Sequence, residues 1–341
     1  MIIFRADGNK TIGWGHVMRC LSVADAFKSS GKEVAFICGG DEMYDLISSR
    51  GYRCEVLGTA YRDMDSETDA LLKNDLFKKA EVIIVDSYFV TEEYIRFLNE
   101  YVKTVYIDDY VSKLPVNVLV NYNIYADREE YEKVYGHSDT TFLLGTDYVP
   151  LRKEYTDGHH ISVKDKAENV LILSGGSDPL HVAYKIAKEI SILEDLDLKY
   201  HFVMGSMSGD REKMEELGAK RDFINVYFDL REMKSLMLKC DMALSASGTT
   251  LYELCSCGIP TINFITADNQ KKGACAFCDK GIMLSLGDVC ESDDFAKKAV
   301  AAIKDLSGNK EKRKALSLAG CNLIKGNGAE NLARKIEELI L

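Results

Sequence analysis

Near its N-terminus the sequence places a histidine directly after two closely spaced glycines, in the stretch Gly13-Trp14-Gly15-His16. An apolar run precedes the stretch and an amphipathic pattern follows it, which predicts a loop between a strand and a helix. The glycines allow a tight turn and the close approach of a ligand. His16 lies in the first helical turn, where the helix dipole disfavours the imidazolium form. It is therefore a candidate general base near neutral pH; the alternative is a helix residue that faces solvent.

Two charged residues, Arg5 and Asp7, close the preceding strand. They either orient His16 or a sugar, or they form an ion pair at the strand end. The loop lacks the third glycine of a dinucleotide-binding fingerprint, and the second strand does not end in an acidic residue. These two departures argue against a nicotinamide-dependent dehydrogenase.

Three loops in the second half of the chain have compositions suited to anions or sugars. The segment Gly175–Asp178 precedes a helix and resembles an anion cradle. The segment Ser247–Thr250 heads another helix, whose unpaired N–H groups and hydroxyls would bind a diphosphate. Glu253 either reaches the ribose hydroxyls of a nucleotide or closes a capping box at that helix. Asn269 and Gln270 open a third helix, where their amides would hydrogen-bond sugar hydroxyls.

The elements that position these loops alternate between strand and helix, which predicts parallel sheets covered by helices on both faces. The predicted strands are MIIFRAD, EVAFICGG, EVIIVDSY, TVYIDDY and VNVLVNYN in the first half and NVLILSGG, YHFVMGS, INVYFD, MALSAS, TINFIT and IMLSL in the second. The polar stretch 150–168 separates the two sets and is predicted to be the linker. The sequence thus predicts an α/β fold with two doubly wound, Rossmann-like domains that face each other across a cleft. The expected domains are residues 1–153, with the His16 loop, and residues 154–341, with the other loops and the terminal helices.

Length and charge narrow the class of protein. A chain of 341 residues is long enough for two domains. The net charge of −11 and the lack of a basic cluster argue against nucleic acid as a partner. The first residues do not have the pattern of a signal peptide, and no apolar run reaches the roughly 20 residues that span a bilayer. We therefore expect a cytoplasmic protein without a membrane span.

The ten cysteines are then expected to be reduced thiols. Cys255 with Cys257 and Cys275 with Cys278 have spacings that offer four thiolates to zinc. Both pairs fall in helical patterns, however, and free cysteine is among the most buried residue types. Core packing is therefore the favoured interpretation. The adjacent pair Asp108-Asp109 lacks the spacing of a metal-binding Asp-x-Asp motif and is interpreted as a strand-end pair.

Together, the loops resemble the GT-B superfamily and, within it, the UDP-2,4-diacetamido-2,4,6-trideoxy-β-L-altropyranose hydrolase family of pseudaminic acid biosynthesis. The motifs that carry the resemblance are GWGHVMRCLSVADAF, DSYFVT, IDD, NYNIYA, LLGTDYVPLRKEY, GGSDP, SGTTLYELCSCGIPT and ADNQ. The resemblance spans the chain from Ile2 to the final helix. Tyr252 departs from it, because many members of the family carry tryptophan there.

The resemblance implies an enzyme of surface polysaccharide biosynthesis that hydrolyses the bond between a sugar's anomeric carbon and UDP, with inversion and without metal or cofactor. It assigns His16 as the base that deprotonates the attacking water. The residues expected to contact the UDP-sugar, from the resemblance and the loops together, are Asp7, Gly13, Gly15, Tyr88, Arg152, Gly176, Ser177, Asp178, Ser247, Gly248, Thr249, Thr250, Glu253, Asn269 and Gln270. The alternatives are a glycosyltransferase with a UDP-sugar donor and a non-catalytic nucleotide-sugar-binding protein.

Overall fold

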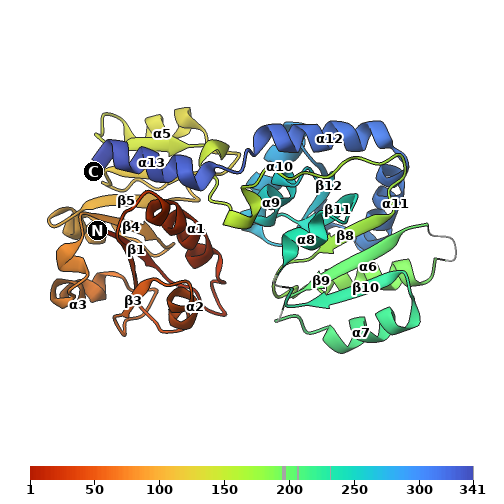
Figure 1. Ribbon diagram of the computed structural model, residues 1–341, viewed down its shortest axis with the longest axis horizontal. Coiled ribbons are helices and arrows are strands. Elements are labelled where there is room, and N and C mark those ends of the chain that lie inside the picture. Colours follow the sequence, from red (N-terminus) through yellow and green to blue (C-terminus); the bar gives the residue numbers. More distant parts are fainter. Residues whose placement is uncertain (194–196, 206, 231, 341) are drawn as a thin grey trace. The chain divides into compact units, whose positions relative to one another are not determined.

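The chain forms two compact units in the computed structural model, which describes residues 1–341 except 194–196, 206, 231 and 341. The first unit comprises Met1–Lys153 together with Gly326–Leu341, and the second comprises Glu154–Lys325. Figure 1 shows that each unit is a sheet flanked by helices. Two Rossmann-like domains, as the sequence predicts, are confirmed.

The first unit is built on a seven-stranded parallel sheet with the strand order β3-β2-β1-β4-β5-β6-β7. Its strands are β1 (Ile2–Ala6), β2 (Val34–Cys38), β3 (Arg53–Val56), β4 (Val82–Asp86), β5 (Lys103–Ile107), β6 (Val118–Asn121) and β7 (Thr141–Leu144). The central strands β1 and β4 are buried along their whole length. Their runs of β-branched and aromatic residues suit this position, because helices cover both faces of a parallel sheet.

The helices of the first unit are α1 (Gly15–Ser29), α2 (Tyr44–Ser49), α3 (Thr68–Lys73), α4 (Glu92–Asn99), α5 (Arg128–Tyr135) and α13 (Gly328–Ile340). Short 3₁₀ turns lie at η1 (Asp65–Glu67), η2 (Phe77–Lys79), η3 (Thr146–Tyr148) and η4 (Lys153–Tyr155), where η4 begins at the last residue before the second unit.

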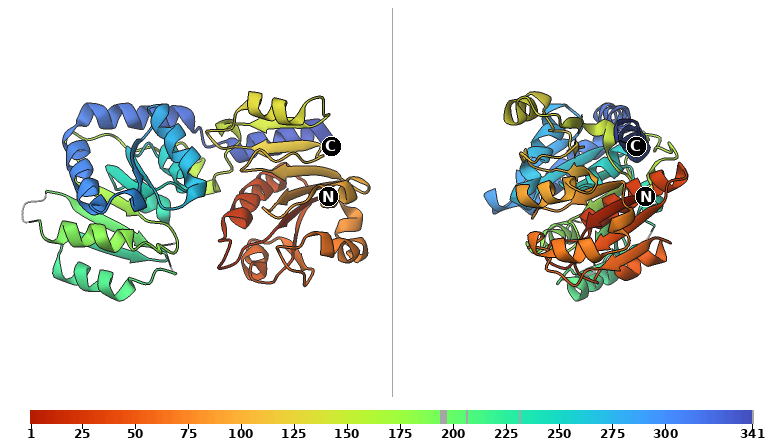
Figure 2. Two further views of the ribbon diagram at one scale, coloured as in Figure 1. Left: turned by 180° about the vertical axis from the view of Figure 1, so that it is seen from behind. Right: turned by 90° about the vertical axis from the view of Figure 1, so that its left-hand side faces the viewer.

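The terminal helix α13 was expected in the second domain, but the structure places it elsewhere. It belongs to the first unit and packs on α1; Figures 1 and 2 show it, in blue, among the red and yellow elements of that unit. Leu332 and Ile336 are buried on its apolar face. At its start, a Cβ added to Gly328 would lie 2.2 Å from the carbonyl oxygen of Val149, so the two backbones approach too closely for a side chain. The helical period predicts that α13 has an apolar face, but not which unit covers it.

The second unit has a six-stranded parallel sheet with the strand order β10-β9-β8-β11-β12-β13. Its strands are β8 (Asn169–Leu173), β9 (Lys199–Met204), β10 (Ile224–Phe228), β11 (Met242–Ala246), β12 (Thr261–Ile265) and β13 (Leu284–Asp288). Its helices are α6 (Val182–Ser191), α7 (Arg211–Lys220), α8 (Met233–Met237), α9 (Thr250–Ser256), α10 (Lys271–Asp279), α11 (Phe295–Gly308) and α12 (Lys310–Leu323), with 3₁₀ turns η5 (Asp268–Gln270) and η6 (Val289–Glu291).

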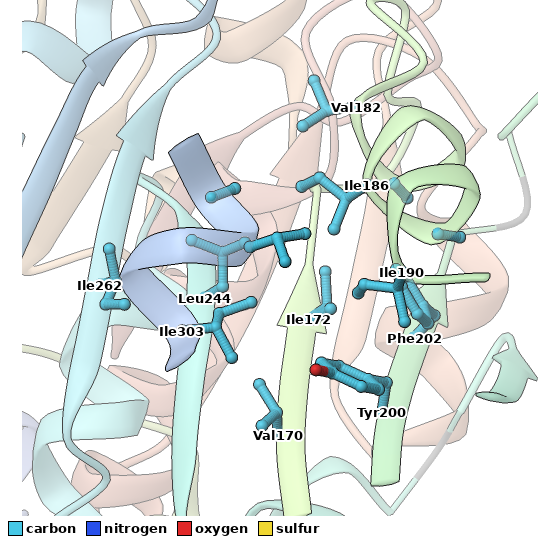
Figure 3. Close-up of a cluster of buried hydrophobic side chains, with 14 of the residues drawn as sticks. Val170, Ile172, Val182, Ile186, Ile190, Tyr200, Phe202, Leu244, Ile262 and Ile303 are labelled. Carbon is cyan, nitrogen blue, oxygen red and sulfur yellow. The ribbon is translucent and has the colours of Figure 1, made fainter. Parts of the chain in front are cut away.

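A large hydrophobic cluster of the second unit lies between its sheet and the helices on one face. Figure 3 shows Ile172 and Phe202 from the strands opposite Ile186 and Ile190 of α6, all buried. The expected linker 150–168 is part of this unit beyond Lys153, because Tyr155 is buried and the Ile161 N–H donates to the Cys257 carbonyl at 3.0 Å.

In both sheets the strand order reverses beside the first strand: β1 lies between β2 and β4, and β8 lies between β9 and β11. Doubly wound sheets bind ligands outside the carboxyl ends of the strands at such a point. The loops after these strands therefore carry the candidate functional residues. Within the described part of the chain, no helix is long and apolar enough to cross a membrane.

Candidate active site

His16 lies at the start of α1, beyond the carboxyl end of β1. Gly13 adopts a positive φ of 76° and forms an antiparallel bridge with Asn9, which folds the loop back before the helix begins at Gly15. This conformation favours glycine, because an L side chain is strained there. His16 is only 5% exposed. The structure thus excludes the alternative of a histidine that faces solvent.

The imidazole of His16 is paired with the carboxylate of Asp86, the last residue of β4. Nδ1 of His16 lies 2.6 Å from Oδ1 of Asp86. An ionised carboxylate only accepts hydrogen bonds, so Nδ1 must carry the proton and donate it. Nη2 of Arg19 also lies 3.2 Å from Nδ1, but a protonated Nδ1 cannot accept from it, and the shorter contact decides the tautomer. Nε2 of neutral His16 is therefore the atom that can accept a proton.

Arg19, one turn after His16 on α1, holds Asp86 from the other side. Its Nε donates to Oδ2 of Asp86 and its Nη2 to Oδ1, both at 2.6 Å. Its Nη1 donates to the Tyr122 hydroxyl at 2.7 Å and to Asp109 at 3.0 Å. Burial acts to raise the pKa of the Asp86 carboxyl, but the charge of Arg19 and the bonds from Arg19 and His16 outweigh it and hold that pKa well below its usual range. Asp86 is therefore a carboxylate at neutral pH.

Tyr88, the predicted sugar contact of the first unit, lies against His16. The two rings meet edge to face with centroids 4.6 Å apart. The Tyr88 hydroxyl donates to Oδ2 of Asp109 at 2.9 Å, and partial burial together with the charge of Asp109 raises the pKa of this phenol. The ring is 44% exposed and also contacts the exposed Tyr110. Tyr88 thus presents a fixed aromatic surface beside the candidate base.

Arg5 and Asp7 form an ion pair at the strand end and do not contact His16. Nη1 of Arg5 donates to Asp7 at 2.5 Å, and its Nε and Nη2 donate to the buried Glu67 at 2.8 and 2.6 Å. The other oxygen of Asp7 accepts from the Gly39 N–H at 2.7 Å. The structure therefore favours the ion-pair interpretation, and a contact between Asp7 and substrate remains a prediction.

A cavity of about 310 Å³ lies at the carboxyl ends of the strands of the second unit. Its size is within the roughly 300–1,000 Å³ of small-molecule sites. Its lining residues are Leu173, Gly175, Gly176, Val203, Met204, Gly205, Asp229, Leu230, Met233, Ser245, Ala246, Gly248, Thr250 and Gln270. Three of the four loops singled out in the sequence contribute, because they follow β8, β11 and β12 of this sheet.

The residues of the glycine loop after β8, the predicted anion cradle, have different surroundings in the structure. Gly176 lines the cavity and Ser177 is exposed. The two carboxylate oxygens of Asp178 instead accept the N–H groups of Val182 and Ala183, both at 2.9 Å. Asp178 is buried and these bonds cap α6, while its expected contact with a ligand stays a prediction.

The loop after β11 keeps polar groups free at the edge of the cavity. Gly248 and Thr250 line the cavity, and among the residues that the structure describes the backbone N–H groups of Thr249 and Thr250 have no hydrogen-bond partner. The hydroxyl of Ser247 donates to the Phe264 carbonyl at 2.8 Å, which fixes this loop to β12. Glu253 lies in the first turn of α9 and is half-buried.

The remaining predicted contacts are dispersed. Gln270 lines the cavity, and its Oε1 accepts the Thr266 N–H at 2.9 Å, whereas Asn269 is exposed outside the lining. Arg152 is half-buried in the first unit, in the segment after η3.

The four cysteines whose spacing suggested a zinc site are free thiols and do not form one cluster. Cys255 and Cys257 are buried, as the packing interpretation predicts, but Cys275 and Cys278 on α10 are exposed, which corrects that interpretation for the second pair. Burial raises the pKa of the Cys257 thiol to about 12. Within the described ranges no group of three or more His, Cys, Asp or Glu is placed to hold a metal ion.

His16, Arg19, Asp86, Tyr88 and Asp109 together form what we call the His16 cluster. The sequence did not single out three of them as site residues: Arg19, Asp86 and Asp109. The signals were present, since Asp86 and Asp109 lie near the carboxyl ends of predicted strands and Arg19 lies three residues after His16. Residues three apart share a helix face, and parallel strands bring their carboxyl ends together. The pairing of Ala6 with Asp86 between β1 and β4 is what places the carboxylate beside the histidine.

Comparison with curated proteins finds relatives over most of the chain. It is 26% identical over 282 residues to the uncharacterized protein MJ1062 of Methanocaldococcus jannaschii, a match that covers 78% of the chain but only 56% of that protein. It is 25% identical to the spore coat polysaccharide biosynthesis protein SpsG of Bacillus subtilis, over 83% of the chain and 82% of SpsG. It is 22% identical to the UDP-2,4-diacetamido-2,4,6-trideoxy-β-L-altropyranose hydrolase of Campylobacter jejuni, over 74% of the chain and 86% of that protein. No family model matches.

Comparison with solved structures gives the fold. MurG of Acinetobacter baumannii superposes with a TM-score of 0.70 at 12% identity, over 99% of both chains. The UDP complex of MnaA from S. aureus superposes with a TM-score of 0.69 at 12% identity, over 100% of this chain and 97% of that one. These similarities, with the two parallel sheets, confirm a GT-B fold.

Proposed function

We propose that this chain, a distant homologue of SpsG and of the altropyranose hydrolases of pseudaminic acid biosynthesis, is a hydrolase that releases UDP from a nucleotide sugar. The observation that carries the proposal is the buried pair of His16 and Asp86, whose 2.6 Å contact leaves Nε2 of His16 as the proton acceptor. A neutral histidine oriented by a carboxylate is suited to activating water near neutral pH.

In the proposed reaction, Nε2 of His16 takes a proton from water while the water oxygen bonds to the anomeric carbon. The bond from that carbon to the diphosphate oxygen breaks, and its electron pair leaves with UDP. Attack opposite the leaving group inverts the anomeric carbon. Asp86 stabilises the imidazolium of His16, because the charge-assisted bond to Nδ1 strengthens when the ring is protonated. The products are the free sugar and UDP, and His16 then returns its proton to solvent.

The cavity of the second unit is the proposed site of the nucleotide. MnaA, which has a similar fold, was solved with UDP, and the free N–H groups of Thr249 and Thr250 suit a diphosphate. Apolar side chains, Leu173, Val203 and Met233 among them, line the rest of the cavity. These apolar side chains suit the uracil base of the nucleotide, because small-molecule sites combine apolar walls with a few polar groups. The proposed reaction uses no cofactor or metal.

The proposed sugar is the diacetamido-trideoxyhexose that the Campylobacter relative is named for. Tyr88, beside His16, is the proposed contact for its ring. Glu253, Arg152, Asn269 and the other predicted contacts remain part of this proposal. We also propose a cytoplasmic location and a role in surface polysaccharide biosynthesis, in keeping with the name of SpsG.

The test measures UDP release from a panel of UDP-diacetamido sugars without any acceptor, by anion-exchange chromatography. We expect release from at least one sugar, and we expect His16→Gln to lower kcat by about 10²–10⁴-fold. The affinity for UDP, measured by calorimetry, should stay unchanged in this variant. His181→Gln is the matched control, because His181 also donates from Nδ1 to a carboxylate, that of Asp210 at 2.6 Å, but in the second unit. It should keep the wild-type kcat.

Two outcomes would overturn the proposal. Turnover that begins only when an acceptor sugar is added would make the chain a glycosyltransferase. Tight UDP binding with no turnover under either condition would make it a nucleotide-sugar-binding protein.

A further inference from the structure

We propose that Asp109 is a second carboxylate of the base system, which holds Arg19 and Tyr88 in place and offsets the charge that His16 gains with the proton. This inference rests on the proposed role of His16 and extends it to a residue that contacts neither water nor sugar in the proposed reaction. Asp109 is thus a positioning residue.

The side chain of Asp109 bonds two residues that contact His16 or its partner Asp86, namely Arg19 and Tyr88. Its oxygens accept Nη1 of Arg19 at 3.0 and 3.1 Å, Nδ2 of Asn123 at 2.9 Å and the Tyr88 hydroxyl at 2.9 Å. The side chain is 14% exposed. The adjacent Asp108 serves a different group, since it accepts the N–H groups after β5 and the Tyr131 hydroxyl of α5. The two neighbouring aspartates therefore have separate roles.

Asp109 is connected to His16 along two paths. The first runs through Arg19, whose Nη1 bonds Asp109 and whose Nη2 bonds Asp86, the partner of His16. The second runs through Tyr88, whose hydroxyl bonds Asp109 and whose ring meets the imidazole edge to face. Loss of Asp109 would therefore remove one anchor of the guanidinium, which Asp86 and Tyr122 still hold, and the hydroxyl contact that fixes the Tyr88 ring.

The charges of the cluster balance only when His16 is protonated. Asp86 and Asp109 bring two negative charges, and Arg19 brings one positive charge. With neutral His16 one negative charge is left over, and the imidazolium neutralises it. An unbalanced charge costs more in a buried site than in water, so the second carboxylate favours the protonated state that the reaction creates.

The other groups that face His16 keep their charge state near neutral pH. Burial raises the pKa of the Cys20 thiol, which lies 3.5 Å from Asp86, and also raises the pKa of the Tyr122 phenol. The phenol of Tyr88 has a raised pKa as well. Arg19 stays protonated, and Asp7, which does not contact His16, is bound to Arg5. Asp109 is therefore the carboxylate whose removal changes the charge around His16 without removing its hydrogen-bond partner.

The test substitutes Asp109→Asn and compares it with Asp109→Glu and Asp108→Asn. Asparagine keeps the shape. With its oxygen in the place of Oδ1 it can still accept from Arg19 and Asn123, and its N–H₂ group can donate to the Tyr88 oxygen, but this group then also faces Nη1 of Arg19, which is another donor. Glutamate keeps the charge. Asp108→Asn removes a neighbouring carboxylate that bonds neither Arg19 nor Tyr88.

Two readouts are taken on each full-length variant. The first is the pH at which the His16 imidazole titrates by NMR, with its signal assigned by its loss in His16→Gln; it needs no substrate. The second is the acid limb of kcat/KM against pH. We expect Asp109→Asn to move both to lower pH by about one unit, since loss of a nearby negative charge disfavours the imidazolium. We expect both readouts of Asp109→Glu to stay close to their wild-type values, because the charge is kept. In Asp108→Asn both readouts should move by no more than a small fraction of the shift seen in Asp109→Asn.

An unchanged imidazole titration in a folded Asp109→Asn overturns the inference, and so does a shift of equal size in Asp108→Asn. Asp109→Ala removes the same charge and gives the same test if the amide variant does not fold. If the wild type releases no UDP from any sugar, the proposed function fails, while the NMR titration still decides whether Asp109 is coupled to His16.

Discussion

Replacing Asp86 by asparagine tests whether the orientation and charge of His16 make it a base. Asp86 accepts Nδ1 of His16 at one oxygen and Nε of Arg19 at the other. Asparagine offers one acceptor oxygen and one N–H₂ group. If the oxygen faces Arg19, the amide donates to Nδ1, the ring proton moves to Nε2, and the proposed base is blocked. If the oxygen faces His16, the tautomer is kept, but the imidazolium loses its counter-charge and Arg19 faces another donor.

The two orientations bracket the expected loss of rate. Loss of the counter-charge alone is expected to make His16 about 10²-fold less basic and to lower kcat by a similar factor. A blocked base costs about 10⁴-fold, the size found when the carboxylate that orients a catalytic histidine is replaced by its amide. We therefore expect kcat to fall by about 10²–10⁴, which is roughly 2.7–5.4 kcal/mol of activation free energy.

The same substitution should lower the stability of the first unit. Breaking a buried ion pair costs about 3–5 kcal/mol, and the lower end applies because Asp109 still balances Arg19. For a unit of this size we expect the unfolding midpoint to fall by roughly 6–12 °C. Activity must therefore be compared well below this transition, with the folded fraction checked by circular dichroism.

The assay measures kcat for UDP release and the affinity for UDP by calorimetry in Asp86→Asn. The affinity should be unchanged, because the proposed nucleotide site is in the second unit. Asp210→Asn is the control, since Asp210 is the partner of His181, an aspartate-paired histidine of the second unit. A folded Asp86→Asn with a kcat within about threefold of the wild type would refute this account of the base, because a threefold change is less than 0.7 kcal/mol.

Three further predictions concern the nucleotide cavity, the buried charges and acid stability. Gly205→Ala should weaken UDP binding by at least about tenfold in calorimetry, because its Cβ would lie 2.1 Å from the Gly176 carbonyl oxygen; Gly209→Ala, where a Cβ meets nothing within 4 Å, should bind UDP as the wild type does. Glu67→Gln should lower the free energy of unfolding by about 3–5 kcal/mol in urea titrations, because it leaves a fully buried guanidinium underpaired, while activity per folded molecule is retained. The pKa of Asp86 is depressed in the folded chain, so its stabilisation is present above the unfolded pKa of about 3.9 and is lost as the pH falls towards the folded pKa. Asp86→Asn should therefore lose less stability than the wild type between about pH 5 and pH 2, and an equal loss would contradict the assignment.

The central strands of both sheets were predictable, and the edge strands of the first sheet were not. All six strands of the second unit and β1, β2, β4, β5 and β6 coincide with the predicted apolar runs. The missed strands, Arg53–Val56 and Thr141–Leu144, lie at the two edges of the first sheet. Edge strands are covered less and need less apolar sequence, so RCEV and TFLL give a weaker signal than a buried strand.

The site was predictable where a residue's own loop defines its environment. The turn at Gly13 and the start of a helix at Gly15 place His16 from local sequence alone. The partners of His16 could not be assigned in this way, because Asp86 reaches it through pairing of strands that lie 80 residues apart. The cap formed by Asp178 was not predictable, because carboxylate chemistry suits a ligand contact as well as a helix cap; the hydrogen bonds to Val182 and Ala183 show the cap.

The most direct test of the central claim is one turnover of the UDP-sugar in ¹⁸O-labelled water, with both products analysed by mass spectrometry. Attack of a His16-activated water on the anomeric carbon predicts that the label is found in the free sugar and not in UDP, and that His16→Gln forms neither product at the wild-type rate. Label in the β-phosphate of UDP would show attack at phosphorus and would contradict the proposed mechanism.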